Sequence, residues 1–178
     1  MLSLSFMRHA NTDLAYCNVD DITRPISRNG QKKTRIVCKH LKTKQIKFDL
    51  IFCSPSLRTK ETLKCMLENN QCKRAKIIED FDIYNGSEEN FLLKLSNTED
   101  FKNLLVITHE PQIESFVNYF LAENQNNEKF TNYNFVPSSL ITIEFKSKSW
   151  KSISGSNAIF KRFIDPNTLI KKKNKNLF

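Results

Sequence analysis

Arginine and histidine side chains follow three apolar segments of the chain. Arg8 and His9 come directly after the first apolar run, Arg58 lies one helical turn beyond Ser54-Pro55, and His109 ends the run NLLVITH. Guanidinium and imidazole groups suit the oxygens of a tetrahedral phosphoryl group, and a neutral imidazole is also a nucleophile near neutral pH. If these side chains meet, they predict an anion site that could carry out phosphoryl transfer.

The segments that carry these residues have the character of buried strands. Short, bounded apolar runs occupy 1–6, 48–54 and 103–109, and 74–80 is a weaker candidate. Helical patterns lie between them at about 31–44, 56–69, 87–95 and 111–122. Strands that alternate with helices predict an α/β fold with a mainly parallel sheet, in which functional groups collect at the carboxyl ends of the strands.

The helix at 31–44 is expected to bury one face made of Ile36, Val37, His40 and Leu41. The stretch SSLITIEFKSKSWKSISGS, from residue 138, predicts two strands that complete one side of the sheet. The residues after it are expected to form a surface arm and then a loose tail.

Size and composition predict a single globular unit. The 178 residues fit one domain at 1–165 followed by a basic tail at 166–178. No apolar run is long enough for a membrane span, so we expect a cytoplasmic protein without a membrane partner. Five scattered cysteines predict free thiols in a reducing compartment.

The net charge of +9 comes from 28 lysines and arginines against 19 acidic residues. Lysines occur along the whole chain, which favours a solvated basic surface and disfavours nucleic acid as a partner.

Four segments together resemble the histidine phosphatase superfamily: FMRHANT, DITRPISRNG, DLIFCSPSLRTKET and LLVITHEP. Within it, the chain is most similar to the SixA-type phosphohistidine phosphatases, for which Arg-His-Ala, an Asp-x-x-Arg-Pro segment and a His-x-Pro are typical. The resemblance covers nearly the whole chain. It implies a three-layer αβα sandwich of the phosphoglycerate mutase-like type, in a small version without a large lid insertion.

The resemblance also implies a role for each residue of the predicted site. His9 would take the phosphoryl group as nucleophile, while Arg8, Arg58 and a protonated His109 would hold its oxygens. Thr12 would either bond the phosphate or cap a local turn. No metal or other cofactor is required, because fixed cations can balance the charge that develops on the phosphoryl oxygens.

The expected general acid is missing. Other branches have a glutamate after the third strand, where this chain has Asn85 or a neighbour. An imidazole leaves a phosphohistidine with less help from an acid than an alkoxide needs to leave an ester. Asp82, Glu88 and Glu110 nevertheless remain possible acids, and Glu110 departs from the asparagine that is usual in the SixA branch.

These observations predict a phosphatase that removes phosphate from phosphohistidine on a signalling or phosphotransfer protein and releases inorganic phosphate. Two alternatives stay open: a phosphatase of a small phosphate ester, and a non-catalytic phosphate-binding module. Asp21 and Arg24 are expected to form a structural pair more than a substrate contact. Arg28 is expected to be exposed to solvent, and His40 is expected to play no part in the chemistry.

Overall fold

The computed structural model describes residues 1–13, 15, 20–69, 72, 74–122 and 133–175. Its strands are β1 Leu2–Arg8, β2 Leu50–Cys53, β3 Lys76–Glu79, β4 Asn103–Thr108, β5 Leu140–Phe145 and β6 Ala158–Ile164. Its α-helices are α1 Arg28–Thr43, α2 Leu57–Glu68, α3 Asp82–Asn85, α4 Glu88–Ser96, α5 Gln112–Leu121 and α6 Pro166–Lys175. No helix among these is long and apolar enough to cross a membrane.

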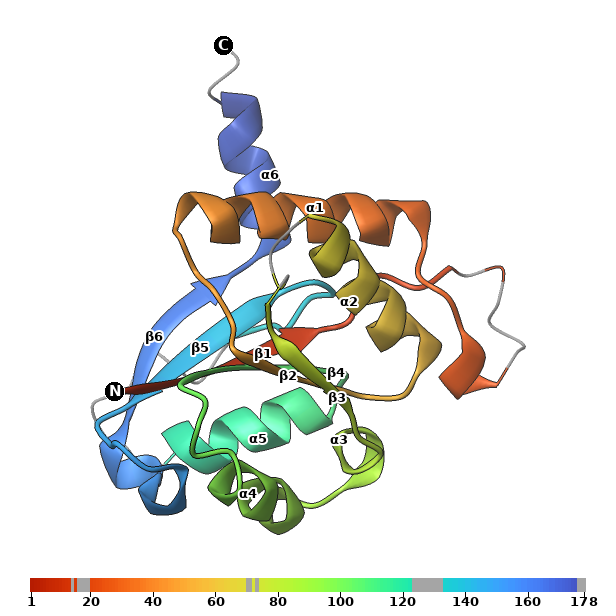
Figure 1. Ribbon diagram of the computed structural model, residues 1–178. Coiled ribbons are helices and arrows are strands. Elements are labelled where there is room, and N and C mark those ends of the chain that lie inside the picture. The colour runs from red at the N-terminus through yellow and green to blue at the C-terminus, as the bar shows by residue number, and fades with distance from the viewer. Residues whose placement is uncertain (14, 16–19, 70–71, 73, 123–132, 176–178) are drawn as a thin grey trace.

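The six strands form one sheet in the order β3-β2-β4-β1-β5-β6. The first four run parallel, whereas β5 is antiparallel to β1 and β6 is antiparallel to β5. Helices α1 and α2 cover one face, and α3, α4 and α5 cover the other (Figure 1). The predicted three-layer αβα sandwich with a mainly parallel sheet is confirmed, and none of the described elements forms a separate lid.

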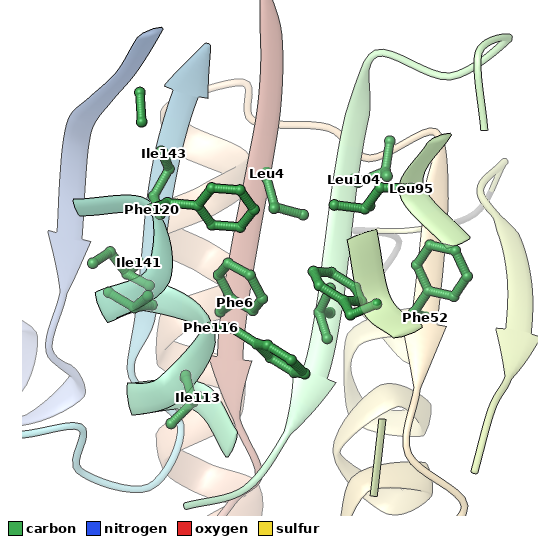
Figure 2. Packing of buried hydrophobic residues seen from close by; sticks show 14 of the residues in the cluster. Leu4, Phe6, Phe52, Leu95, Leu104, Ile113, Phe116, Phe120, Ile141 and Ile143 are labelled. Atoms are coloured by element: carbon green, nitrogen blue, oxygen red, sulfur yellow. The ribbon is translucent and has the colours of Figure 1, made fainter. Parts of the chain in front are cut away.

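Alternate residues of the central strands point into two apolar layers. Phe6 of β1 lies with α4 and α5, where its ring contacts Phe91 at 5.9 Å and Phe116 at 5.8 Å between centroids (Figure 2). The next residue, Met7, lies in the opposite layer with Val37 of α1. Because both faces of β1 are packed in this way, the end of the strand is held firmly at the site.

Helices α1 and α4 each begin after a serine that caps the first turn. The hydroxyls of Ser27 and Ser87 accept hydrogen bonds from the backbone N–H groups of Gly30 and Asn90, and Pro111 directly precedes α5. Such caps satisfy N–H groups that have no partner within the helix.

The predicted face of α1 is partly wrong. Val37 and Leu41 are buried as expected, but Ile36 and His40 lie at the margin. Thr34 and Cys38 are buried in their place. The buried face of α1 is therefore adjacent to the predicted face. It includes Thr34, Val37, Cys38 and Leu41, which are spaced by three and four residues.

The carboxyl-terminal region also corrects the predictions. The second strand expected within 138–156 lies later, at 158–164, so the predicted surface arm is an edge strand of the sheet. Residues 150–152 and 155–157 form short 3₁₀ helices instead. Buried Trp150 anchors them by donating its Nε1–H to the Phe101 carbonyl at 2.7 Å.

The predicted loose tail is wrong for residues 166–175, which form α6. Asp165 accepts hydrogen bonds from the Asn167 N–H and the Thr168 hydroxyl, and Leu169 packs against the core beside α1. A cap and a partly buried side chain that packs against the core are enough to order a short helix of this kind. The domain boundary at residue 165 stays a prediction.

Four of the cysteines, Cys38, Cys53, Cys65 and Cys72, are buried free thiols, as predicted. Burial raises the pKa of Cys38, Cys53 and Cys72 to about 12, so these thiols are unreactive near neutral pH. Cys17 lies outside the described residues.

Gly30 allows α1 to lie directly against the residues that follow His9. A Cβ on Gly30 would be 2.4 Å from the Asn11 carbonyl oxygen and 3.1 Å from the Ala10 Cβ. We therefore expect Gly30→Ala to lower the free energy of unfolding by roughly 1–3 kcal/mol, because backbone must move to admit the methyl group. Urea denaturation would measure this change.

Exposed Lys32 on the same helix provides the control. Lys32→Ala should change the free energy of unfolding by no more than about 0.5 kcal/mol. Equal stabilities for the two variants would contradict the close approach at Gly30.

Candidate active site

The carboxyl ends of β1 and β4 and the amino end of α2 border a pocket of about 550 Å³. Arg8, His9, Thr12, Arg58 and His109 all line it. The predicted meeting of two arginines and two histidines around one cavity is therefore confirmed. The pocket is rich in cationic and imidazole groups, as an anion site requires.

His9 directly follows β1, and its ring is fixed in one tautomer. Nδ1 lies 2.7 Å from the Ala10 carbonyl oxygen, which can only accept, so Nδ1 carries the proton. The pKa of His9 is lowered to about 3, mainly by burial; the charges of Arg58 and Arg8 contribute to this shift, and the hydrogen bond with Ala10 opposes it. At neutral pH the ring is uncharged and Nε2 keeps its lone pair, which a nucleophile needs.

Arg8 ends β1 with its guanidinium partly occupied. Nη1 donates to the Phe135 carbonyl, whereas the buried Nε has no hydrogen-bond partner among the described residues. Burial lowers the pKa of Arg8 and Glu110 opposes this shift, but an arginine stays protonated in proteins. Arg8 is thus a fixed cation with donor capacity left for an anion.

Arg58 lies in the first turn of α2 and is 5% exposed. It donates to the Asp21 carbonyl oxygen, and its Nη2 lies 2.7 Å from the Asp21 Oδ2. Asp21 also pairs with Arg24 and accepts a hydrogen bond from the Tyr84 hydroxyl at 3.0 Å. The predicted Asp21–Arg24 pair is present, and both residues line the pocket.

These contacts keep Asp21 ionised. Partial burial acts to raise its pKa, but the hydrogen bond from Tyr84 and the charges of Arg58 and Arg24 outweigh burial, so the net shift is downward. A phosphate that enters the pocket must therefore share Arg58 with a carboxylate that is already bound to it.

His109 follows β4 and is buried opposite His9, with 6.4 Å between the ring centroids. Its Nε2–H donates to the Tyr84 carbonyl at 3.1 Å, and its buried Nδ1 has no partner among the described residues. Burial, with Arg58 and Arg8, lowers the pKa of His109 although the Tyr84 bond and Asp21 raise it. The surroundings of His109 therefore favour the neutral ring. A second proton on His109 beside the phosphoryl oxygens stays a prediction, because an adjacent anion favours the charged form.

The three candidate acids differ in whether they line the pocket. Asp82 pairs with Lys94 at 3.0 Å, Glu88 accepts a hydrogen bond from the Ser115 hydroxyl, and neither lines the pocket. Glu110 does line it, as does Asn85 at the position where other branches are expected to carry their acid. Of the three carboxyl groups suggested by the sequence, Glu110 alone is placed to act on a bound phosphate.

The remaining predicted residues divide between the pocket and the surface. Thr12 lines the pocket while its backbone pairs with Ile26, and its contact with phosphate stays a prediction. Arg28 is exposed, and neither it nor His40 is among the pocket residues.

Sequence reasoning missed Tyr84, which orients two site residues at once. Its carbonyl accepts from His109 and its hydroxyl donates to Asp21. The available signal is its place just after the third strand, next to Asn85 at the expected position of the acid.

Comparison with known proteins agrees with this geometry. Residues 4–85 match the histidine phosphatase superfamily (branch 1). The matched residues include Arg8, His9 and Arg58, and these three side chains line one pocket with His109.

Solved structures of three phosphatases share the fold. The protein histidine phosphatase SixA complexed with tungstate is 21% identical with a TM-score of 0.75, over 94% of this chain and 99% of that one. The alpha-ribazole phosphatase from Shigella flexneri is 12% identical with a TM-score of 0.68, over 93% and 97%.

A mycobacterial glucosyl-3-phosphoglycerate phosphatase is 11% identical with a TM-score of 0.67, over 91% of this chain and 98% of that chain. No curated protein matches the chain by sequence. At these identities the structural likeness shows the fold alone.

Proposed function

We propose that this protein is a metal-independent histidine phosphatase that works through a phosphohistidine intermediate on His9. The observation that carries the proposal is the neutral His9 ring, held by the Ala10 carbonyl, in one pocket with Arg8, Arg58 and His109. A fixed nucleophile surrounded by donors for phosphoryl oxygens meets the main needs of phosphoryl transfer.

The reaction proceeds in two displacements. The lone pair on Nε2 of His9 attacks phosphorus, the bond to the leaving group breaks, and the leaving group takes up a proton. Arg8 and Arg58 then hold the phosphoryl oxygens while water attacks phosphorus and the bond to Nε2 breaks. Water loses one proton in this step, His9 returns to its neutral form, and inorganic phosphate is released.

The preferred substrate in this proposal is phosphohistidine on a signalling or phosphotransfer protein. Asn85 in place of an acid supports this choice, because an imidazole needs little protonation to leave. The shared fold with a protein histidine phosphatase is in accord with it, and the buried free thiols are in accord with a reducing, cytoplasmic setting.

A small phosphate ester is the second candidate substrate. Two structural neighbours are named as phosphatases of small molecules, and Glu110 brings a carboxyl group to the pocket. An ester substrate requires that this group work as an acid.

Phosphate release in EDTA tests the proposal. We expect the protein to release phosphate faster from a phosphohistidine-bearing protein than from an alkyl phosphate. EDTA should change either rate by no more than about twofold, since the fixed cations of the pocket take the place of a metal. Faster release from the alkyl phosphate would move the substrate class to esters. Loss of all turnover in EDTA, restored by added metal, would overturn the metal-independent mechanism.

A further inference from the structure

We propose that Glu110 is the proton donor to the leaving group, and that it takes the proton back from water in the second displacement. This inference rests on the proposed phosphatase function and extends it, because it assigns the acid that is missing from its expected position after the third strand. It also widens the substrate class to phosphates whose leaving group is strongly basic.

The carboxyl groups of Asp21 and Glu110 both line the pocket. Their surroundings favour different protonation states, as in enzymes where one carboxyl group is the general acid and the other stays ionised. Asp21 contacts Arg58, Arg24 and the Tyr84 hydroxyl, all of which favour its charged form. The Oε1 atom of Glu110 is shielded from solvent and has no hydrogen-bond partner among the described residues. A buried carboxylate oxygen without a partner is costly, so the neutral acid is the favoured form of Glu110.

The charged groups that face Glu110 come from two elements. Burial and the charge of Glu114 in α5 favour the neutral acid, whereas the charge of Arg8 at the end of β1 and a hydrogen bond from the Glu114 backbone favour the ionised form. Burial is the largest of these effects and raises the pKa of Glu110 to about 7. Across the pocket, His9 and His109 are neutral in the phosphate-free site, because burial lowers both of their pKa values.

Glu110 also borders a second cavity. Beside the phosphate pocket lies a space of about 310 Å³, and Arg8, Glu110 and Pro111 line both. Tyr133 and the buried Phe135 line the second space as well. In a substrate whose phosphoryl group lies beside His9, before transfer, the leaving group would have room in this second space, and Glu110 borders both spaces.

Glu110 alone can supply the proton in the first displacement and recover it in the second. In the first displacement the Glu110 carboxyl gives its proton to the leaving oxygen or nitrogen as the bond to phosphorus breaks, and it becomes a carboxylate. In the second displacement the carboxylate removes a proton from the attacking water, the bond between phosphorus and His9 breaks, and the neutral acid is regenerated. No other acid or base is needed.

The experiment compares leaving groups in a matched pair of variants. We expect Glu110→Gln to lower kcat/KM by about 10²-fold on an alkyl phosphate but by less than about threefold on an aryl phosphate, since a phenolate leaves without a full proton. Glu88→Gln makes the same change at a carboxylate outside the pocket and should leave both values unaltered. An equal loss on both substrates would overturn the proposal and make Glu110 a residue that positions Arg8. No loss on either would also overturn it.

The pH profile gives a second readout. With Glu110 active only as the neutral acid, kcat/KM on the alkyl phosphate should fall as pH rises through about 7. The phosphate group of the aryl phosphate also undergoes a second ionisation, as that of the alkyl phosphate does. The aryl profile therefore serves as the internal control for ionisation of the substrate. Glu110→Gln should remove the difference between the two profiles, and a difference that persists would contradict the assignment.

Formation of a phosphoenzyme from the aryl phosphate tests the proposed phosphatase function separately from the role of Glu110. A labelled His9 in both the unmodified protein and Glu110→Gln would support the phosphatase function whichever way the alkyl result falls. Absence of any label or turnover in the unmodified protein would be a failure of the proposed function itself.

Discussion

Replacing His9 with alanine should lower phosphate release by about 10⁴-fold or more, because the group that accepts the phosphoryl is removed and water must attack directly. The unmodified protein should also form an acid-labile, alkali-stable phosphoenzyme that His9→Ala cannot form. Steady-state phosphate release and labelling with a radioactive aryl phosphate would measure the two effects. The expected loss is the largest of any substitution proposed for this protein.

His40 is the matched control for this variant. It is the one histidine outside the pocket and lies partly buried on α1. His40→Ala should keep kcat within about threefold, and both variants should unfold in one cooperative transition. Residual turnover by His9→Ala above about one per cent of normal would contradict a covalent role for His9.

Replacing Arg58 with alanine should lower kcat/KM by roughly 10²- to 10³-fold. Arg58 is a buried cation that presents two N–H groups to one partner, now the Asp21 carbonyl and carboxylate. A phosphoryl group in the pocket would use the same fork. Without it, the charge that develops on the oxygens is stabilised less, and the Asp21 carboxylate repels the substrate.

Arg58→Lys should recover little of this loss, because a lysine ammonium keeps the charge but lacks the planar pair of donors. Arg28→Ala is the control, since Arg28 is exposed on α1 and lies outside the pocket. Steady-state kinetics on an aryl phosphate would compare the three variants. Near-normal kcat/KM in Arg58→Lys would show that charge alone is sufficient and that the fork geometry is not required.

Local patterns were sufficient for most of the fold. The apolar runs before Arg8 and His109 are buried strands, and α4 begins next to Ser87, at the start of the predicted 87–95 helix. These features depend on side chains close together in the chain, so short-range rules describe them. The carboxyl-terminal region depends on distant partners, and there the predictions failed.

Strand β6 and helix α6 illustrate that failure. The 158–164 segment is a strand because it pairs with β5, and α6 is ordered partly by Leu169, which packs against the core. Neither partner is visible in a local pattern, and several lysines in 171–175 favour an exposed tail when read alone.

The sequence by itself determined the residue types of the site and, through the parallel sheet, that Arg8, His9, Arg58 and His109 would share one edge. The tertiary structure decided their chemical states. Burial lowers the pKa of His9 and His109, contacts with Tyr84 and Arg58 lower the pKa of Asp21, and burial raises the pKa of Glu110 to about 7. The physical reason is that a proton affinity depends on solvent exposure and on charges brought together from distant segments, which no local spacing specifies.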